Sequence, residues 1–356
     1  MAKTYRIAAI PGDGIGGEVV SAGRGVLDRA AAASGFGLAW QEFPWGADYH
    51  AAHGAMMPAD ALATLRGFDA IYLGAVGDPR LPDHVTLNGL LLPIRRGFDQ
   101  YACVRPAVLY PGTRSPLAGR QPGDIDFVVV RENTEGEYAH AGGVVHGGGA
   151  HEVAVQTAVF TRRGTERVIR FAFDLARARA GKRRLTSVTK SNAQGYSMVF
   201  WDRVFADVAA EYPDVATESR LVDAACMDLV RRPESFDVIV ASNLFGDILT
   251  DLSATITGSL GLAPSANLNP ARTAPSMFEP VHGSAPDIAG RNLANPMAAI
   301  LAGAMMLDFL GEAAAGARIG SAVRDVLAAG RTLTRDLGGT ATTTDVAGAV
   351  AARIQS

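Results

Sequence analysis

The stretch FDVIVASNLFGDILTDL, residues 236–252, joins an apolar strand pattern directly to an apolar helix pattern. Its first seven residues form a short and mainly apolar run, which is typical of a buried strand. The helix pattern that follows carries Asp247 and Asp251 four residues apart, so both carboxylates lie on one helical face. Like charges at this spacing repel each other, and charged groups are rare on so apolar a helix. The stretch therefore predicts a strand–helix unit that brings two carboxylates to a site.

The same alternation of strand and helix patterns recurs along the chain. The runs that predict strands are YRIAAI (5–10), FDAIYLGAV (68–76), DIDFVVV (124–130), RRLTSVTK (183–190) and FDVIVAS (236–242). The runs that predict helices cover residues 17–33, 165–179 and 195–212. This order favours an α/β protein with largely parallel strand pairing.

Length and charge exclude several classes of protein. A chain of 356 residues is long enough for two domains. A net charge of −3 argues against a dedicated nucleic-acid binder, which would show a basic excess. The two cysteines, Cys103 and Cys226, cannot make a disulfide framework, so a reducing, cytoplasmic compartment is expected. We see no apolar leader at the N-terminus, and the longest apolar run, residues 295–310, is interrupted by Asp308, so no membrane association is expected.

A glycine-rich turn follows the first predicted strand, in YRIAAIPGDGIGGEVV (5–20). Gly12, Gly14 and Gly17 fit the G-x-G-x-x-G fingerprint of dinucleotide-binding turns, and Glu42 ends a plausible second strand. Asp13, however, would put a negative charge beside a pyrophosphate. The turn is equally well interpreted as a tight bend whose glycines only permit positive φ. Both interpretations stay open at this point.

Three arginines follow or end apolar segments: Arg95, Arg105 and Arg131. An arginine at the end of a strand is placed to bind a carboxylate bidentately. Each one alone is more simply a surface ion-pair partner, but together they favour an anionic substrate. Lys190 also ends a strand pattern, either as a solvated side chain or as a proton acceptor with a lowered pKa.

The paired aspartates favour a metal site. Oxygen-only ligands are what Mg²⁺ or Mn²⁺ prefers, and Asp223, in RLVDAACMDLV (220–230), is a candidate third ligand. The simpler alternative is two helix-surface aspartates. Separately, the glycine-rich and then alternating segment 140–161 is either a solvent loop or an arm that pairs with a second chain.

Four motifs together resemble a known family: IPGDGIG (10–16), RENTEGEY (131–138), NLFGDILTDL (243–252) and MFEPVHGSAPDIAGRNLANPMAAI (277–300). They are similar to the metal-dependent β-decarboxylating dehydrogenases of 2-hydroxy acids, which include isocitrate, isopropylmalate, homoisocitrate and tartrate/D-malate dehydrogenases. The resemblance covers nearly the whole chain, and residues 81–106 look most like the tartrate/D-malate branch. It implies a two-domain α/β fold that is not a Rossmann fold and has mixed sheets with flanking helices. Residues 1–100 plus 258–356 would form the domain on the cofactor side. Residues 101–257 would form the second domain, and an arm near 139–160 would be swapped in a homodimer with shared active sites.

The resemblance also implies roles for individual residues. The substrate carboxylates would be bound by Arg95, Arg105 and Arg131, with Asn88 and Leu91 facing the group at C3. The metal would be held by Asp247 and Asp251 with Asp223 from the partner chain, and Lys190 from the partner would help take the hydroxyl proton. Tyr138 would protonate the product carbon after CO₂ leaves. The cofactor would contact Asn192, Glu279, His282, Gly283, Ser284, Ala285, Asp287 and Asn295.

The implied activity is NAD- and metal-dependent oxidative decarboxylation of a small 2-hydroxy diacid, D-malate or tartrate. Asp287 favours NAD, because a carboxylate repels the 2′-phosphate of NADP. The alternative within the family is 3-isopropylmalate dehydrogenase. Two other classes are a Rossmann reductase without a metal, which EDTA would not inhibit, and a non-catalytic subunit, which would have lost catalytic positions. The sequence leaves the preferred acid and any requirement for K⁺ open.

Overall fold

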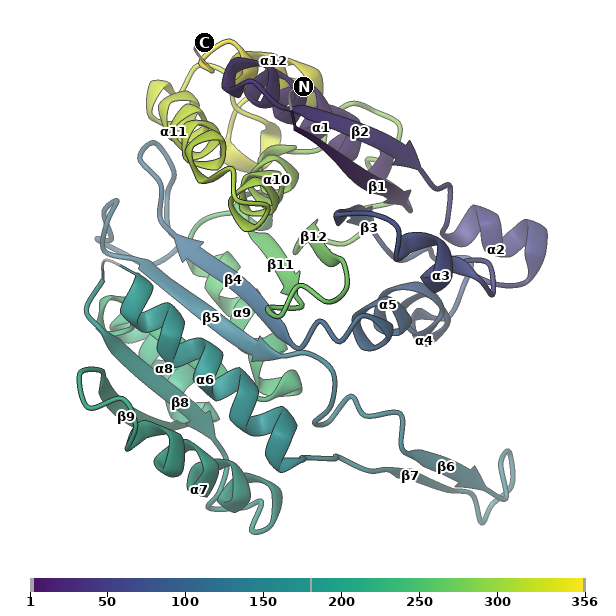
Figure 1. Ribbon diagram of the computed structural model, residues 1–356, viewed down its shortest axis with the longest axis vertical. Coiled ribbons are helices and arrows are strands. Elements are labelled where there is room, and N and C mark those ends of the chain that lie inside the picture. The colour runs from purple at the N-terminus through teal and green to yellow at the C-terminus, as the bar shows by residue number, and fades with distance from the viewer. Residues whose placement is uncertain (1–2, 180, 355–356) are drawn as a thin grey trace.

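A computed structural model describes residues 3–179 and 181–354, and its main feature is a ten-stranded mixed sheet (Figure 1). The strand order is β2-β1-β3-β12-β11-β4-β5-β10-β8-β9. The strands are β1 (Thr4–Gly12), β2 (Gly37–Glu42), β3 (Ala70–Ala75), β4 (Ala102–Val108), β5 (Asp126–Glu132), β8 (Arg184–Thr189), β9 (Ala216–Leu221), β10 (Val238–Ala241), β11 (Pro264–Leu268) and β12 (Ser276–Pro280).

The sheet consists of two parallel wings joined by an antiparallel centre. Strands β2, β1, β3 and β12 pair in parallel, as do β5, β10, β8 and β9. Between them, β11 runs antiparallel to both β12 and β4, and β4 runs antiparallel to β5. The predicted parallel pairing is confirmed in the wings. The antiparallel centre makes the sheet mixed, as the family resemblance implied, and the strand patterns did not reveal its strands β4, β11 and β12.

Helices cover both faces of each wing (Figure 1). They are α1 (Gly16–Ser34), α2 (Ala47–His53), α3 (Ala61–Leu65), α4 (Asp83–Thr86), α5 (Leu92–Gly97), α6 (Arg162–Ala178), α7 (Ser197–Ala209), α8 (Val222–Arg231), α9 (Asn243–Ile256), α10 (Met297–Phe309), α11 (Ala313–Ala329) and α12 (Thr343–Ala351). A π-helical turn (Leu87–Leu91) links α4 to α5, and short 3₁₀ turns lie at Pro233–Ser235, Leu260–Leu262 and Arg335–Leu337. Within the described residues, no helix is both long and apolar enough to span a bilayer.

The hydrophobic core is divided between the wings. One cluster packs α1, α10, α11 and α12 on the wing built from the two ends of the chain, and a second covers the opposite face of that wing. A third lies entirely within residues 107–256, around Trp201 and Phe173. This division agrees with the expected domains, whose boundaries near residues 100 and 257 stay a prediction.

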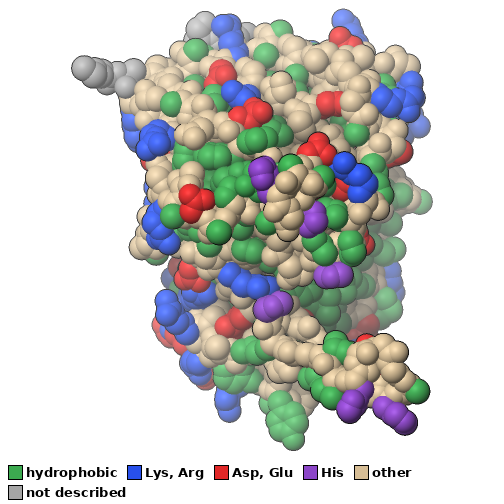
Figure 2. Space-filling model, turned by 90° about the vertical axis from the view of Figure 1, so that its right-hand side faces the viewer, with side chains coloured by type: hydrophobic (Ala, Val, Ile, Leu, Met, Phe, Trp, Pro, Cys, Tyr) green, Lys and Arg blue, Asp and Glu red, His purple; other side chains and the backbone are tan. Residues whose placement is uncertain are grey.

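The glycine-rich segment forms a projecting hairpin, β6 (Gly142–Val145) and β7 (Val153–Gln156), rather than an irregular loop (Figure 1). We call residues 139–160 the arm. Its valines Val144, Val145, Val153 and Val155 are each more than half exposed. Figure 2 shows hydrophobic and histidine side chains on the surface of this projecting lobe, at the lower right. An isolated two-stranded hairpin with an apolar surface is marginal in water, so the arm is shaped to pair with something else.

The PGDG turn after β1 is held by contacts within the protein. Asp13 is buried, and its carboxylate accepts hydrogen bonds from the backbone N–H groups of Ala47, at 2.7 Å, and Gly77, at 2.8 Å. Gly12 and Gly14 have φ of 70° and 54°, and a Cβ on Gly14 would lie 2.0 Å from the carbonyl oxygen of Ser284. The glycines are therefore required by close approach of the chain, which favours the tight-bend interpretation over a phosphate cradle.

Candidate active site

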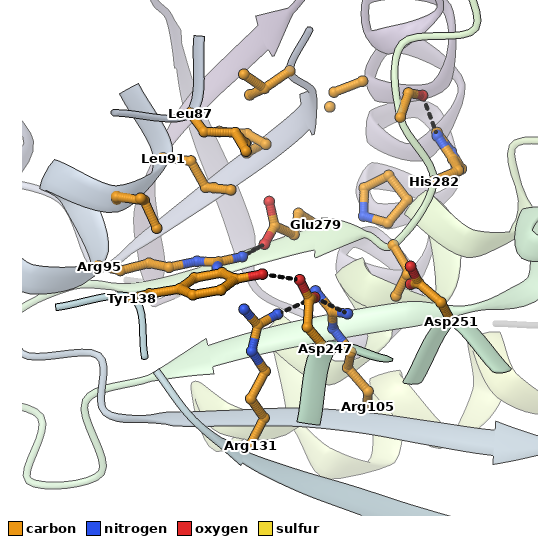
Figure 3. Close-up of a pocket in the computed structure, with 18 residues that line it drawn as sticks. Leu87, Leu91, Arg95, Arg105, Arg131, Tyr138, Asp247, Asp251, Glu279 and His282 are labelled. Atoms are coloured by element: carbon orange, nitrogen blue, oxygen red, sulfur yellow. Dashed lines mark hydrogen bonds and ion pairs between the residues drawn. The ribbon is translucent and has the colours of Figure 1, made fainter. Parts of the chain in front are cut away.

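A pocket of about 220 Å³ lies where the two wings meet, and residues from β3, β4, β5, β12, α5, α9 and the π-helical turn converge on it (Figure 3). Its polar lining is Arg95, Arg105, Arg131, Tyr138, Asp247, Asp251, Glu279 and His282. Its apolar lining includes Leu73, Val76, Leu87, Leu91 and Leu92. The structure thus brings together the three predicted substrate arginines, both predicted aspartates of α9 and the predicted tyrosine.

The three arginines are buried and enter the pocket from different elements. Arg95 comes from α5, Arg105 from β4 and Arg131 from β5, at the antiparallel centre of the sheet. Arg95 donates to Glu279 Oε1 at 2.7 Å, while its buried Nε has no hydrogen-bond partner among the described residues. Buried guanidinium groups with donors left over are suited to a bidentate carboxylate.

Asp247 is the residue on which the pocket converges. Its Oδ1 accepts from Arg131 and, at 3.4 Å, from Arg105, while its Oδ2 accepts from the Tyr138 hydroxyl at 2.7 Å (Figure 3). Burial opposes ionisation of Asp247, but the two arginines and the Tyr138 hydroxyl outweigh it and lower its pKa. Asp247 is therefore a carboxylate at neutral pH.

Asp251 has the opposite environment, one helical turn further along α9. Burial and the neighbouring charge of Asp247 raise its pKa, and Arg105 and Arg131 only partly offset this. In the described residues it makes no ion pair. An additional cation between the two carboxylates would relieve their repulsion, which is the chemical reason to expect a metal there.

Two local features hold α9 against the pocket. Glu137 accepts from the Ser242 hydroxyl at 2.7 Å and from the Leu244 N–H at 3.1 Å, so it caps the start of the helix and fixes the neighbouring Tyr138. A Cβ on Gly246 would lie 2.6 Å from the Cβ of Arg131, so only glycine lets α9 pack this closely on β5. The segments RENTEGEY (131–138) and NLFGD (243–247) therefore pack directly against each other.

Tyr138 is protonated at neutral pH. Burial raises its pKa to about 12, together with the charge of Asp247, which accepts its hydroxyl hydrogen. The tyrosine can therefore donate a proton.

A second pocket of about 410 Å³ adjoins the first through a shared residue, His282. Of the predicted cofactor residues, it is lined by His282 and Asn295. Burial lowers the pKa of His282, and its Nε2 has no hydrogen-bond partner among the described residues. An elongated ligand can therefore reach from one pocket into the other past a neutral histidine.

The remaining predicted cofactor residues surround these pockets to different degrees. Glu279 and Gly283 line the first pocket. Ser284 is buried, and its backbone carbonyl holds the PGDG turn by accepting a hydrogen bond from the N–H of Ile15 at 2.8 Å. Ala285 has a left-handed φ of 39°, a strained conformation that is common at functional loops. Asp287 is exposed and lines neither pocket.

Sequence patterns missed part of the second pocket. It is also lined by Ile15, Leu260, Arg335 and Asp336. Asp336 accepts from Ser259, at 2.5 Å, and from Asn295, at 3.0 Å. These residues come from separate segments that only the packing of the cofactor-side wing brings together, so no local pattern in the sequence could have found Asp336.

Four further predicted site residues, outside the 279–295 segment, also lie away from the first pocket. Lys190 and Asp223 form an ion pair with each other, 2.8 Å between Nζ and Oδ1, and Asn192 is exposed on the same segment as Lys190. Asn88 is exposed, and its side-chain amide donates to the carbonyl of His84 at 2.8 Å instead of lining the pocket. The structure therefore does not bring Asn88 to the substrate side.

Comparisons with known proteins agree with this geometry. The model of the isocitrate/isopropylmalate dehydrogenase family matches residues 6–350. A decarboxylating D-malate dehydrogenase of Escherichia coli K12 is 55% identical over 357 residues, covering 98% of each chain. A tartrate dehydrogenase/decarboxylase of Pseudomonas putida is 50% identical over 357 residues, covering 98% of this chain and 97% of the relative. The crystal structure of isocitrate dehydrogenase from Methylococcus capsulatus superposes with a TM-score of 0.88 at 38% identity, covering 99% of this chain and 100% of that one.

Fold, site and relatives together define an enzyme, a decarboxylating dehydrogenase. The chain belongs to the isocitrate/isopropylmalate dehydrogenase family. The predicted fold, different from a classical Rossmann fold, is thereby confirmed.

Proposed function

We propose that the chain catalyses the NAD- and divalent-metal-dependent oxidative decarboxylation of a small malate-type 2-hydroxy acid, D-malate or tartrate, to a 2-keto acid and CO₂. One observation carries the proposal: three buried arginines and two adjacent aspartates converge on a single small pocket. The names of the relatives, D-malate and tartrate dehydrogenases, point to the same acids.

The arginines bind the two carboxylates of the acid and orient it. Arg105 is held by Thr250 Oγ1, at 2.7 Å, and Arg131 by Asn243 Oδ1, at 2.7 Å, so both guanidinium groups are positioned before substrate arrives. Preorganised donors cost little reorganisation during the reaction. Arg95 supplies the donor that lacks a partner.

The carboxylates fit part of a site for Mg²⁺ or Mn²⁺. Within the described residues, no group of three or more His, Cys, Asp or Glu can hold a metal ion in one chain, so Asp247 and Asp251 need further oxygen ligands. Asp223 of the partner subunit, with water, is the proposed source. The chemistry supplied by a bound cation is Lewis-acid stabilisation of negative charge on the substrate's C2 oxygen.

Two residues move protons in this proposal. Lys190 of the partner subunit would accept the proton of the C2 hydroxyl, and NAD, when bound, would supply the acceptor for the C2 hydride. Tyr138 then donates its phenolic proton to C3 once the carboxylate on that carbon has departed as CO₂. The raised pKa of Tyr138 supports its role as the acid, because the hydroxyl is protonated at neutral pH.

NAD rather than NADP is the proposed cofactor, and it would occupy the second pocket. Asp336 lines that pocket and Asp287 lies one residue from Ile288, which also lines it. Carboxylates accept hydrogen bonds from ribose hydroxyls and repel a 2′-phosphate. Arg335 also lines the pocket, and its positive charge would instead attract a 2′-phosphate. The test is the catalytic efficiency with NAD divided by that with NADP. A ratio of one or below would contradict the choice of NAD.

A homodimer with shared active sites is part of the proposal. Apolar side chains are exposed on adjacent helices α8 and α9, namely Met227, Val230 and Ile248, as well as on the arm. Contiguous exposed apolar surface of this kind typically marks a protein interface. In this proposal, two chains pair through that surface, and Lys190 and Asp223 of one chain reach the pocket of the other. Within a single chain, both residues lie outside the pocket.

The alternative substrate is 3-isopropylmalate, which the leucine wall of Leu87, Leu91 and Leu92 favours. NADH formation with Mn²⁺, compared across D-malate, L-tartrate, 3-isopropylmalate and isocitrate, separates the two. We expect the highest kcat/KM with D-malate or tartrate and loss of activity in EDTA. A hundredfold preference for 3-isopropylmalate, or full activity in EDTA, would overturn the proposal.

A further inference from the structure

A recess of about 390 Å³ lies on the cofactor-side wing, at the opposite end of β12 from Glu279. It is lined by the start of β1, the segment Arg66–Asp69, the turn before β12 and the end of α10. It shares no lining residue with the substrate pocket or with the second pocket that adjoins it. Its role is therefore separate from the chemistry proposed above.

The lining of this recess is strongly positive. Lys3, Arg66 and Arg272 all face it, and none of the three makes an ion pair within residues 3–179 and 181–354. The one carboxylate in the lining, Asp69, accepts from the Arg6 backbone N–H at 2.7 Å. Asp69, together with Glu312 beside Tyr5, offsets the three cations only in part, so a bound anion would lower the remaining repulsion.

Each of the three cations lies over an aromatic ring, with the Arg66 guanidinium 5.6 Å from the centre of the Phe98 ring. The Arg272 guanidinium lies 4.6 Å from the centre of the Phe309 ring, and Lys3 Nζ lies 4.4 Å from that of Tyr5. Arg272 also has a left-handed φ of 55°, in a turn that buried Asn269 ties to Phe98 and Thr273. A strained arginine on a rigid turn at a cationic recess is an observation that points to function.

We propose that this recess binds a small polyanion carrying two or more phosphate or carboxylate groups. Guanidinium groups bind both kinds of oxyanion bidentately, and the lysine adds a point charge. The aromatic faces of Tyr5 and Phe309 already carry cations, so recognition is through charge and not through stacking of a planar base. Because the recess is separate from the substrate pocket, the anion binds without displacing the substrate.

The decisive variant is Arg272→Gly, which removes the guanidinium and relieves the left-handed backbone at the same time. Arg183→Gly is the matched control, because Arg183 is also an exposed arginine with a left-handed φ, of 50°, and lies outside the recess. Arg66→Gln tests the same recess without touching the turn. Isothermal titration calorimetry at low ionic strength measures binding of pyrophosphate and, separately, of citrate, in metal-free buffer.

We expect the wild type and Arg183→Gly to bind with the same affinity and stoichiometry. Arg272→Gly and Arg66→Gln should each weaken one binding event at least tenfold, while Arg272→Gly melts no lower than the wild type. Citrate bound in preference to pyrophosphate would identify a polycarboxylate, and the reverse a phosphate compound. Equal binding by all four proteins, which would leave only the active-site arginines as the anion site, would overturn the proposal.

Discussion

Asp247 explains why an apolar helix carries a charged residue at this position. Its carboxylate is the common partner of Arg131, Arg105 and Tyr138, so it links the predicted substrate-binding groups to the predicted acid. Arg131 is fully buried, and a buried guanidinium without a carboxylate would be strongly destabilising. The aspartate thus has a structural function in addition to its proposed metal ligation.

Replacing Asp247 with asparagine is expected to lower turnover at least about a hundredfold, because one charged oxygen ligand and the partner of Arg131 are lost. The fold should persist with a lower melting temperature, because Arg131 loses its carboxylate partner but still donates to Asn243. Steady-state kinetics over a Mn²⁺ titration, with circular dichroism of the purified protein, checks this. Asp207→Asn, on the exposed ion pair with Arg162, is the control. Near wild-type turnover at low Mn²⁺ would show that Asp247 is not a ligand.

Glu132 gives a prediction about stability and pH. Burial raises its pKa to about 7, although the N–H groups of Thr134 and Glu135 oppose the shift. A carboxyl whose folded pKa exceeds its unfolded value is more often protonated in the folded state, so its contribution to stability falls as pH rises from about 4.5 to about 7. The free energy of unfolding of the wild type minus that of Glu132→Gln should therefore become smaller or more negative as pH rises through this range, as measured by urea denaturation. A difference that increases with pH would contradict the raised pKa.

At the residue scale, the sequence pointed to the arginines and the two aspartates because these charged residues end or interrupt strong apolar patterns, whereas Tyr138 came from the family resemblance alone. The structure gathers all of them in one pocket. Asn88 shows the limit. Its place in the sequence suggested the substrate side, but which way a side chain points depends on helical phase. The π-helical turn Leu87–Leu91 alters that phase by adding one residue to a turn.

At the scale of elements, this π-helical turn sets the apolar wall of the pocket. It places Leu87, Leu91 and Leu92 on the lining and leaves Asn88 outside. π-helical turns interrupt α-helices frequently at functional sites. Selection among acids that differ at C3 is therefore expected to depend on the leucines.

Leu87→Ala should enlarge the pocket and shift the ratio of kcat/KM for 3-isopropylmalate over D-malate upward by about tenfold, the effect of a few methylenes in an apolar pocket. Asn88→Ala, at the neighbouring exposed position, should leave the ratio within about twofold. Parallel kinetics on both variants checks this. A larger effect from Asn88→Ala than from Leu87→Ala would mean that the side chain at position 88 faces the substrate after all.

The strand patterns of β1, β3, β5 and β10 were evident from the sequence because each contains a run of buried apolar residues, and that of β8 because it is rich in β-branched residues. The central strands β4, β11 and β12 were not. Arg105 and Glu279 within them face the active site, so their patterns are interrupted by charge. The charged residues of the candidate site therefore interrupt the apolar patterns of the strands that carry them.

At the scale of the whole molecule, a single chain does not bring all the predicted site residues together. Its own pocket lacks Lys190 and Asp223, which pair with each other elsewhere on the surface. A sequence pattern alone does not show whether a site residue is contributed by the same chain or by a second copy of the chain. This is why the sequence could indicate the arm only as one of two alternatives.

Mixing Lys190→Ala chains with Tyr138→Phe chains should restore activity if the sites are shared. In a hybrid dimer, one site receives both intact residues, so random exchange should recover roughly a quarter of the wild-type rate. The measurement is turnover after subunit exchange, with each variant alone as control. No recovery, despite exchange proven by mass spectrometry of differently tagged chains, would argue for sites complete within one subunit.

The position of β12 between β3 and β11 has a consequence for how the protein is made. The core within residues 107–256 is contiguous in sequence, so a growing chain can complete it as soon as that segment leaves the ribosome. The first wing has to wait, because β3 pairs with β12, which is translated far later. Until then β3 presents unpaired backbone groups along one edge, a template for unwanted pairing. During synthesis, the wing built from the two ends of the chain is thus exposed to aggregation for longer than the rest. A chain truncated before β12 cannot complete this wing.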